Sequence, residues 1–472
     1  MSLHQDKNMA SISTLGAGTN LDLNTLYDNL QSAEQAQLTP ITNQQASYNA
    51  QLTAWGVVQS SMSKLQTAAS ALENASSIAT TKVTSSNTAF TATLASGAAA
   101  GNYSVEVDQL AAAQSLLSKS ASSESTDLGD SSMASRTITI SQSGQKSPLT
   151  VTLNQDQTSL TDIRDAINKQ QGSVNASVIM ANDNTYYLSL TARDSGTANA
   201  MTVSTNDSTL SQYISYSSGG SNNGMTQQVA AQDAQLKING LAITRSSNIV
   251  TDAPEGVTLN LNKVNSGSPE TLSIATDTTP MATAIQTYVD AYNSLQKTIA
   301  DQTNYTPVQE GQAPSTDNGD LLGDNTLMNI QTSLRSQFSD PQGSGSIQVL
   351  SQLGITQDDK GDLTVDSTKL NAALTNQPAD VLSFLTGDGK TTGFATQVTN
   401  RLNDMLASNG TVSNATTGIN TSLKQLSDQY NNVNDQITAV MAQYKTEFTN
   451  LSTLVSSMTQ TGDYLSAQFA KM

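Results

Sequence analysis

Two short stretches of the chain contain residues that bind phosphate or nucleotide in other proteins. Gly389-Lys390-Thr391 has the last three residues of a phosphate-binding loop, but that loop needs another glycine five positions earlier, where Phe384 stands. Gly16-Ala17-Gly18 begins like a dinucleotide-binding fingerprint, yet Leu21 takes the place of the third glycine. Each pattern lacks a glycine that lets the backbone approach the phosphate, so neither predicts a nucleotide site.

Metal and acid–base chemistry has equally little support in the residue types. Asp358, Asp359 and Asp362 surround Gly361, but calcium loops place their ligands at alternate positions before the glycine, so we expect a turn here. The 472 residues include no cysteine and one histidine, His4. The absence of cysteine excludes disulfides and cysteine-bound metals. A catalytic serine could use only His4 as its histidine base. We therefore expect no enzyme, no metal site and no cofactor.

Charge and composition narrow the class of protein further. The net charge of -18 argues against nucleic acid, because binding phosphates requires a surplus of Lys and Arg, and it argues equally against anionic membrane surfaces. Hydrophobic residues make up 36% and aromatic residues 4%, so compact cores must alternate with thin or solvated elements. The sequence has no apolar run of 18 residues and hence no predicted membrane insertion. We expect an elongated protein with several domains.

The N-terminal region lacks the pattern of a secretory signal. Residues 9–20 read MASISTLGAGTN, with neither a basic start nor an apolar core. Met9 could be the natural start, with Met1–Asn8 as a short leader. The protein is thus expected either to stay in the cytoplasm or to leave by a route that uses no such signal.

The C-terminal region carries an apolar repeat in alternating steps of three and four residues, which is typical of a coiled-coil helix. The opposite face is polar, so the apolar stripe needs a partner. The repeat slips at Glu447, where we expect a bend, and an interruption is expected from Ser408 to Gly418. The apolar positions are Leu423, Leu426, Tyr430, Val433, Ile437, Val440 and Tyr444, followed by Leu451, Leu454, Met458 and Leu465.

Two helices are predicted near the N-terminus. Asn20 or Asp22 can cap the first, and Pro40 ends it and, with Thr39 as cap, starts a second helix over residues 41–72. The apolar stripe of the first helix comprises Leu23, Leu26 and Leu30.

A second heptad repeat lies between Met281 and Ile299, and we expect it to be the core stripe of an intramolecular bundle. Shorter helices are expected at 327–338, 368–374, 378–384 and 395–406. From about Val83 the apolar period changes to two, as in β-strands. Asn239-Gly240 between alternating apolar residues predicts a tight hairpin, whereas the segment 202–228 is expected to be a loop.

The order of these patterns predicts an α+β multidomain fold. Helical, coiled-coil-like legs come from both termini, and two β-rich head domains are inserted between helices. The predicted domains are 1–40, an N-terminal leg that is largely disordered before assembly; 41–82 with 278–418, a helical body; 83–130 with 229–277, an inner β-rich head domain; 131–228, an outer β-rich head domain; and 419–472, a C-terminal coiled-coil leg.

Several stretches carry a family resemblance in the same order along the chain. They are SISTLGAGTNLDLNTLYDNL at 11–30, GNYSVEVDQLAAAQSL at 101–116, INGLAITRSSNIVTDAPEGVTLNL at 238–261, GDLLGDNTLMNIQTSLRS at 319–336 and LGITQDDKGDLTVDSTKLNAAL at 353–374. Together they resemble the flagellar filament capping proteins, also called flagellar hook-associated protein two. The segment 137–191 resembles the flagellin hook "IN" module.

The resemblance implies a secreted structural protein that is exported through the flagellar type III apparatus with an export chaperone. It implies a ring-shaped homo-oligomer, usually a pentamer, at the extracellular tip of the bacterial flagellum, which promotes flagellin folding and insertion and prevents monomer leakage. The legs would contact the filament end or the hook-filament junction protein. The expected oligomer and filament contacts are Leu23, Leu26, Leu30, Leu423, Leu426, Tyr430, Val433, Ile437, Val440, Tyr444, Leu451 and Leu454.

Other functions fit part of the sequence. A surface adhesin would bind host glycan or mucin through the head, using the loop 204–228 with Tyr213 and Tyr216 as an exposed patch. Another hook-associated protein, or a flagellin, is the nearest structural alternative. A secreted acidic polysaccharide hydrolase would need an aromatic cleft with convergent carboxylates, which the 4% aromatic content disfavours.

Overall fold

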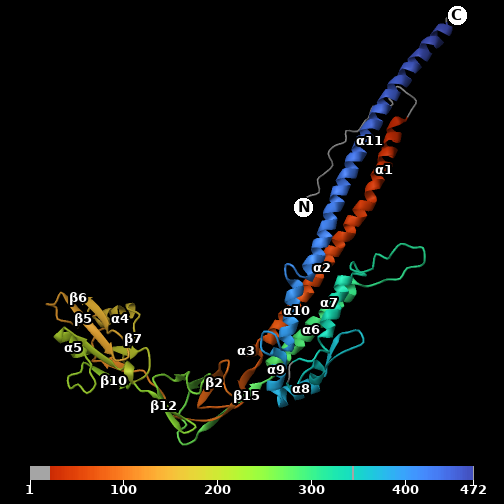
Figure 1. Ribbon diagram of the computed structural model, residues 1–472. Helices are drawn as coiled ribbons and strands as arrows, with labels where there is room; N and C mark the ends of the chain where they lie inside the picture. Colours follow the sequence, from red (N-terminus) through yellow and green to blue (C-terminus); the bar gives the residue numbers. More distant parts are fainter. Residues whose placement is uncertain (1–21, 343–344, 471–472) are drawn as a thin grey trace. The chain divides into compact units, whose positions relative to one another are not determined.

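The computed structural model describes residues 22–342 and 345–470, and the chain divides into two compact units (Figure 1). The first unit takes the residues up to Ala75 and those from Met281 onward, and the second unit is the inserted segment Ser76–Pro280. The predicted insertion of β-rich domains between helices is confirmed. The expected leader, the stretch Gly16-Ala17-Gly18 and the candidate cap Asn20 lie outside the described residues.

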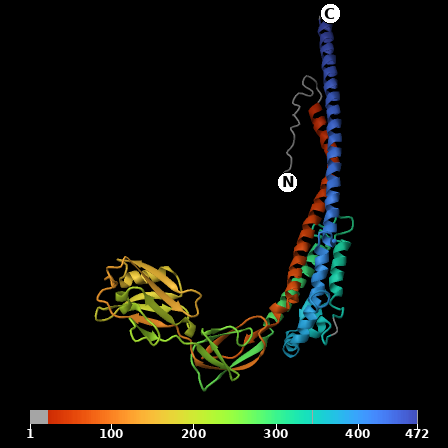
Figure 2. The same ribbon diagram turned by 60° about the vertical axis from the view of Figure 1, so that its left-hand side comes forward.

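Helices form most of the first unit. The two longest, α2 and α11, pack side by side, as Figures 1 and 2 show. The elements are α1 (Leu23–Gln35), η1 (Ala36–Leu38), α2 (Thr39–Glu73), α6 (Thr279–Gln302), α7 (Asn325–Ser336), η3 (Leu350–Leu353), β16 (Ile355–Gln357), β17 (Leu363–Val365), α8 (Ser367–Asn376), α9 (Pro378–Thr386), α10 (Phe394–Leu406) and α11 (Thr411–Phe469). The small hairpin of β16 and β17 was not predicted, because each strand has only three residues.

The chain stays helical where Pro40 was expected to separate two helices. Thr39 has φ -56° and ψ -45°, so it lies inside the helix and does not cap α2. A proline in the first helical turn removes an N–H group that has no helical partner there, so the 3-10 turn η1 can lead directly from α1 into α2. The predicted cap Asp22 is confirmed, because its carboxylate accepts a 3.1 Å hydrogen bond from the N–H of Thr25.

Helix α11 is longer and more continuous than the sequence indicated. The expected interruption from Ser408 to Gly418 shrinks to residues 407–410, and the helix runs through Glu447 as part of one 59-residue element. Its first turns are rich in Thr, Ser and Asn, which read as a loop in sequence. In the structure these side chains bond to carbonyls of the preceding turn, as Thr416 does to Val412 at 3.1 Å, and therefore remain compatible with the helix.

The repeat between Met281 and Ile299 is confirmed as a core stripe of the first unit. Tyr288 and Tyr292 of α6 lie edge-on to Phe394 and Phe338, with ring centroids 5.5 and 4.8 Å apart. Burial raises the pKa of the Tyr292 hydroxyl to about 12. These aromatic contacts fix α6 against α10 and the end of α7, so the stripe is fully used within the unit.

The second unit contains two β domains, each with its own hydrophobic core. In the inner β domain, one sheet has the order β1-β15-β3-β11-β12 and the other β13-β14-β2. The elements are α3 (Ala75–Ile78), β1 (Thr80–Val83), β2 (Phe90–Leu94), β3 (Gly101–Gln109), β11 (Ala234–Ile238), β12 (Leu241–Arg245), β13 (Ile249–Val250), β14 (Val257–Leu261) and β15 (Glu270–Asp277). The predicted Asn239-Gly240 hairpin is confirmed, with positive φ angles of 51° and 82° at the two turn residues.

The outer β domain packs a sheet of order β10-β4-β8-β7 and a sheet of order β6-β5-β9 around two helices. The elements are β4 (Ser115–Ser118), β5 (Ser135–Gln142), β6 (Leu149–Asn154), α4 (Leu160–Lys169), β7 (Val174–Met180), β8 (Tyr186–Ala192), η2 (Thr197–Asn199), β9 (Met201–Thr205), α5 (Ser208–Ile214) and β10 (Met225–Val229). Leu116 of β4 lies in this core, so the outer β domain begins before the expected boundary at residue 131.

The expectation of a loop over 202–228 is wrong for most of that segment. It holds β9, α5 and β10, and only Ser217–Gly224 is a turn between regular elements. Leu210, Ile214 and Tyr216 are buried in the outer core. The segment was predicted to be a loop because its many Ser, Thr and Asn residues outnumber the few apolar ones. Tyr216 is a core residue and not part of an exposed aromatic patch.

Candidate functional site: the paired terminal helices

The predicted contact residues lie on α1 and α11, which pack against each other in the first unit. Ile437 and Met441 of α11 are buried against Leu38, the last residue of η1. Four half-buried side chains surround this cluster: Tyr27, Tyr430, Val433 and Tyr444. The N-terminal and C-terminal repeats are thus partners of each other within one chain. We call this contact the leg seam.

The twelve predicted residues fall into three groups by exposure. Buried are Leu23, Leu426 and Ile437; half-buried are Leu30, Leu423, Tyr430, Val433, Val440 and Tyr444; exposed are Leu26, Leu451 and Leu454. Met441, 2% exposed, was missed, because the heptad count assigned the seam position to its neighbour Val440. Its spacing of four residues from Ile437 is the signal that could have found it.

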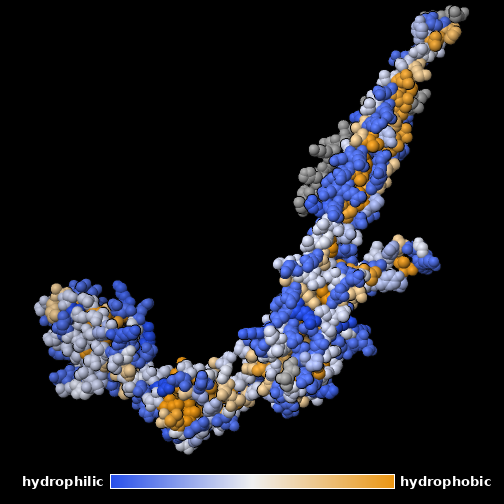
Figure 3. Space-filling model, in the orientation of Figure 1, coloured by the Kyte–Doolittle hydropathy of each residue, from blue (hydrophilic) through white to orange (hydrophobic). Residues whose placement is uncertain are grey.

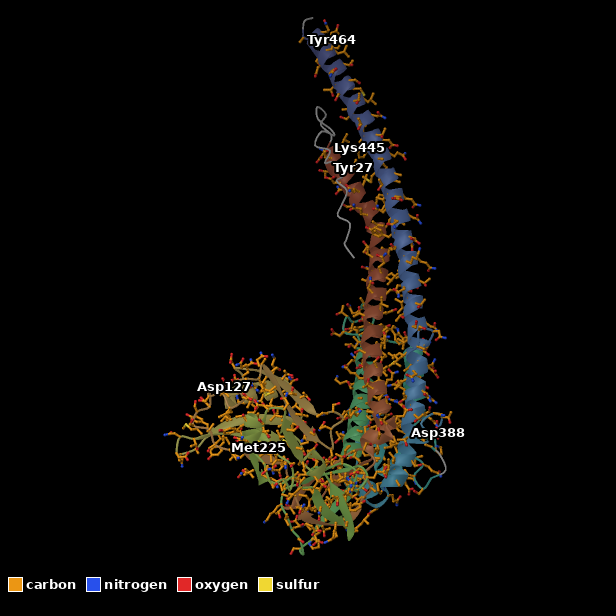
Figure 4. All side chains as sticks on the ribbon, turned by 90° about the vertical axis from the view of Figure 1, so that its left-hand side faces the viewer. Tyr27, Asp127, Met225, Asp388, Lys445 and Tyr464 are labelled. Atoms are coloured by element: carbon orange, nitrogen blue, oxygen red, sulfur yellow. The ribbon has the colours of Figure 1, made fainter. Side chains whose placement is uncertain are left out.

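The apolar stripe of α11 continues past the leg seam into solvent. Tyr27 of α1 lies level with Lys445 of α11, and Tyr464 lies further along α11, beyond the first described turn of α1 (Figure 4). In Figure 3 apolar residues follow this part of the helix. The exposed members are Leu451, Leu454, Met458, Leu465 and Phe469, which range from 39% to 72% exposed. We call them the distal stripe.

Few charges flank these helices. Asn431, Asn432 and Gln436 on the opposite face of α11 are exposed and uncharged, and Lys424 pairs with Asp428 at 3.5 Å on the surface. At the start of α1, hydrogen bonds from the side chain and backbone of Thr25 lower the pKa of Asp22. The opposite face of α11 is thus largely polar, with uncharged side chains between its few charges.

The stretch Gly389-Lys390-Thr391 lies in the turn between α9 and α10. The Asp388 carboxylate accepts hydrogen bonds from the N–H groups of Lys390, Thr391 and Thr392, at 3.0, 2.7 and 2.7 Å. These bonds hold the pKa of Asp388 far below its usual range. The N–H groups that a phosphate would need are already bound to the Asp388 carboxylate. Asp388 lies in the lower part of the first unit in Figure 4.

The acidic stretch around Gly361 is likewise a turn. Asp358 accepts hydrogen bonds from the N–H groups of Lys360 and Asp362, both at 2.9 Å. Within residues 22–342 and 345–470, no group of three or more His, Cys, Asp or Glu side chains could hold a metal ion. Over the same ranges, every helix is too short or too polar to cross a membrane.

Comparison with known sequences assigns the family. Residues 19–114 match the family profile described as "Flagellar hook-associated protein 2 N-terminus", and residues 231–460 match "Flagellar hook-associated protein 2 C-terminus". Residues 137–194 match the "Flagellin hook IN motif", as the sequence predicted. The flagellar hook-associated protein 2 of Xenorhabdus nematophila is 42% identical over 97% of this chain and 99% of its own. That of Escherichia coli K12 is 43% identical over 98% of both chains.

A solved structure supports the same assignment. The crystal structure of domains D1-D2-D3 of the flagellar cap protein FliD from Escherichia coli is similar with a TM-score of 0.66 and 41% sequence identity, covering 78% of this chain and 99% of that one. The predicted α+β fold with helical termini and inserted β domains is confirmed. This chain therefore belongs to the flagellar hook-associated protein 2 family, whose solved Escherichia coli member is a flagellar cap protein.

Proposed function

We propose that this protein is a structural, non-enzymatic cap at the distal end of the flagellar filament. It assembles there as a ring of identical chains, a pentamer, and it promotes the folding and insertion of flagellin while preventing loss of monomers. It reaches this place outside the cell by flagellar type III export with a chaperone. The family assignment supports the cap. The legs contact the filament end or the hook-filament junction protein.

The observation that carries this proposal is the distal stripe on α11. Leu454, Met458 and Phe469 are 56%, 65% and 72% exposed on a helix whose preceding turns are buried in the leg seam. Large apolar side chains repeated along one face of an exposed helix favour an apolar helical partner. In the assembled cap, this stripe and the exposed Leu26 of α1 contact a neighbouring copy or the filament end.

The test is complementation of a deletion strain with Leu454→Asp. Leu454 is exposed in the free chain, so the variant should fold like the wild type but fail to restore swimming, with flagellin monomer spilled into the medium. Thr453→Asp is the matched control, because it adds the same charge at an exposed polar position one residue away. Normal filaments with Leu454→Asp would refute the assignment of the distal stripe as the contact surface.

An adhesin role has no comparable support in the head. The segment that would carry it is mostly regular structure, and Tyr216, one of its two aromatic residues, is 7% exposed and hydrogen-bonds through its hydroxyl to Gln227. Tyr213 packs against the same core. The residues expected to form an adhesive patch therefore stabilise the outer β domain.

A further inference from the structure

Two short connectors join the inner and outer β domains of the second unit. One lies between β3 and β4 and the other between β10 and β11, and they pair through Ala112 and Gln232. The two residues exchange backbone hydrogen bonds of 3.0 Å in both directions. A two-stranded ribbon of this kind twists and bends more easily than a wider sheet. By themselves, these connectors would let the two β domains rotate relative to each other.

A third segment of the chain contacts these paired connectors and the inner β domain beside them. The turn at residues 195–197 belongs to the outer β domain; it follows β8 and ends at Thr197, the first residue of η2. Both oxygens of Asp233, the residue directly before β11 of the inner β domain, bind Thr197: Oδ1 accepts from the N–H at 2.8 Å and Oδ2 from the hydroxyl at 2.7 Å. The Ser195 hydroxyl donates to the carbonyl of Ser246, after β12, at 2.7 Å.

Gly196 allows the two backbones to approach this closely. Its φ of 100° is in the region that favours glycine, and a Cβ placed there would lie 2.5 Å from the Cβ of Ser246 and 2.8 Å from its Cα. Its N–H also donates to the carbonyl of Ala112 in the connector, at 3.2 Å. One glycine thus touches both the connector and the loop after β12, and a larger residue would have to push the domains apart.

We infer that the turn 195–197 is a latch that holds the outer β domain in one orientation on the inner one, by means of Asp233, Ser246 and the side-chain-free Gly196. Thr197 makes two hydrogen bonds to Asp233 in one connector, while Ser195 and Gly196 contact Ser246 beyond the connectors. Together these contacts oppose the rotation that a two-stranded ribbon allows. The latch is built from exposed or half-buried polar groups, so it can open without disturbing either hydrophobic core. The latch lies within the second unit, and the inference does not depend on how the terminal helices bind their partners.

Spin labelling of the full chain tests the latch directly. Because the sequence has no cysteine, the pair Lys169→Cys and Lys263→Cys places one label on each β domain at exposed positions. Pulsed electron paramagnetic resonance then measures the distribution of distances between them. We expect a narrow distribution in the otherwise unchanged chain, and a shifted or broadened one in both Asp233→Ala and Gly196→Ala. Asp233→Asn, which keeps an acceptor for the Thr197 N–H, should change the distribution less than Asp233→Ala.

Asp194→Asn is the matched control, since Asp194 is exposed and adjacent to the latch. A second label pair within the outer β domain, Lys146→Cys and Lys169→Cys, monitors the integrity of that domain. If either Asp233→Ala or Gly196→Ala gives the wild-type distribution between the β domains, the latch is refuted. Broadening of the pair within the outer domain would also refute it, because the turn would then be needed for folding rather than for orientation.

Discussion

A fully buried ion pair in the outer β domain leads to the strongest prediction about stability. The side chains of Arg136 at the start of β5 and Asp207 before α5 are both 0% exposed, with Nε and Oδ2 2.9 Å apart. The other guanidinium nitrogens donate to four backbone carbonyls at 2.7–3.1 Å: those of Asp130, Met133, Asn154 and Gln155. Asp207 also accepts from the N–H groups of Asp130, Thr209 and Leu210. The pair therefore ties together three separate stretches of chain, residues 130–136, 154–155 and 207–210.

Replacing Asp207 by Asn removes the negative charge with little change of shape. Arg136 then remains buried without its counter-charge, and breaking one member of such a pair costs about 3–5 kcal/mol. For a domain of this size, one kcal/mol shifts the melting temperature by roughly 4 °C, so a fall of about 12 °C or more is expected for the outer β domain. Asp156→Asn, at an exposed position, is the control and should change the free energy of unfolding little.

Thermal unfolding of the full chain, followed by circular dichroism and hydrogen exchange, measures this loss. Trp55 is the only tryptophan and lies buried in α2 of the first unit, so its fluorescence reports whether that unit is unaffected. A melting temperature of the outer domain within about 3 °C of the wild type would refute the reasoning. Arg136→Met combined with Asp207→Leu should be less damaging than Asp207→Asn, because no unpaired charge remains buried.

The same pair predicts the direction of the pH dependence. Burial pushes the pKa of Asp207 upward, but the three backbone donors and Arg136 outweigh it, so the pKa of the folded protein lies below its ordinary value. A group with a depressed pKa stabilises the fold above its unfolded pKa of about 3.9, and this contribution is lost as the pH falls through the folded pKa. The outer β domain of the wild type should therefore lose stability below about pH 4, and Asp207→Asn should lack this part of the loss.

Two further substitutions test other parts of the fold. Ile437→Asp places a charge in the leg seam, where Ile437 is 5% exposed, and should lower the stability of α1–α11 pairing by more than about 2 kcal/mol. This loss should appear as faster hydrogen exchange in α1, and unchanged exchange there would contradict the leg seam. Gly224→Ala puts a Cβ 2.5 Å from the carbonyl oxygen of Ser211 and should destabilise the outer β domain by about 1–3 kcal/mol, measured by urea unfolding. Gly219→Asn is the control and should not destabilise the domain, because its Cβ enters open space and Asn tolerates the φ of 73°.

Local periodicity accounts for the parts of the fold that could be predicted from the sequence. The repeats of α6 and α11 have a period that only a helix places on one face, and Asn239-Gly240 has the two residues that a tight hairpin requires. The limits of α11 were wrong because Thr, Ser and Asn favour loops when considered one at a time. Their bonds to the carbonyls of the preceding turn, which sequence composition does not reveal, keep them helical.

Features that depend on residues far apart in the chain were missed. Arg136 and Asp207 are ordinary charged residues in sequence, and nothing in their local pattern indicates that they meet in a core. The burial of Leu210 and Ile214 follows from the same contact, because Asp207 caps α5 and directs its apolar face inward. The close approach at Gly196 could not be predicted either, because it depends on Ser246, which comes from the other β domain.

The apolar repeat of α11 shows how far sequence reasoning can go at the candidate site. The heptad pattern identifies Ile437 and Leu454 alike as positions that need a partner, but it does not say where the partner comes from. In the structure Ile437 is covered by Leu38 of the same chain, whereas Leu454 is 56% exposed. Asp at position 437 should therefore destabilise the free chain as well as the cap, whereas Asp at position 454 should impair only assembly. Equal loss of stability in the two free variants would show that the leg seam and the distal stripe are not distinct surfaces.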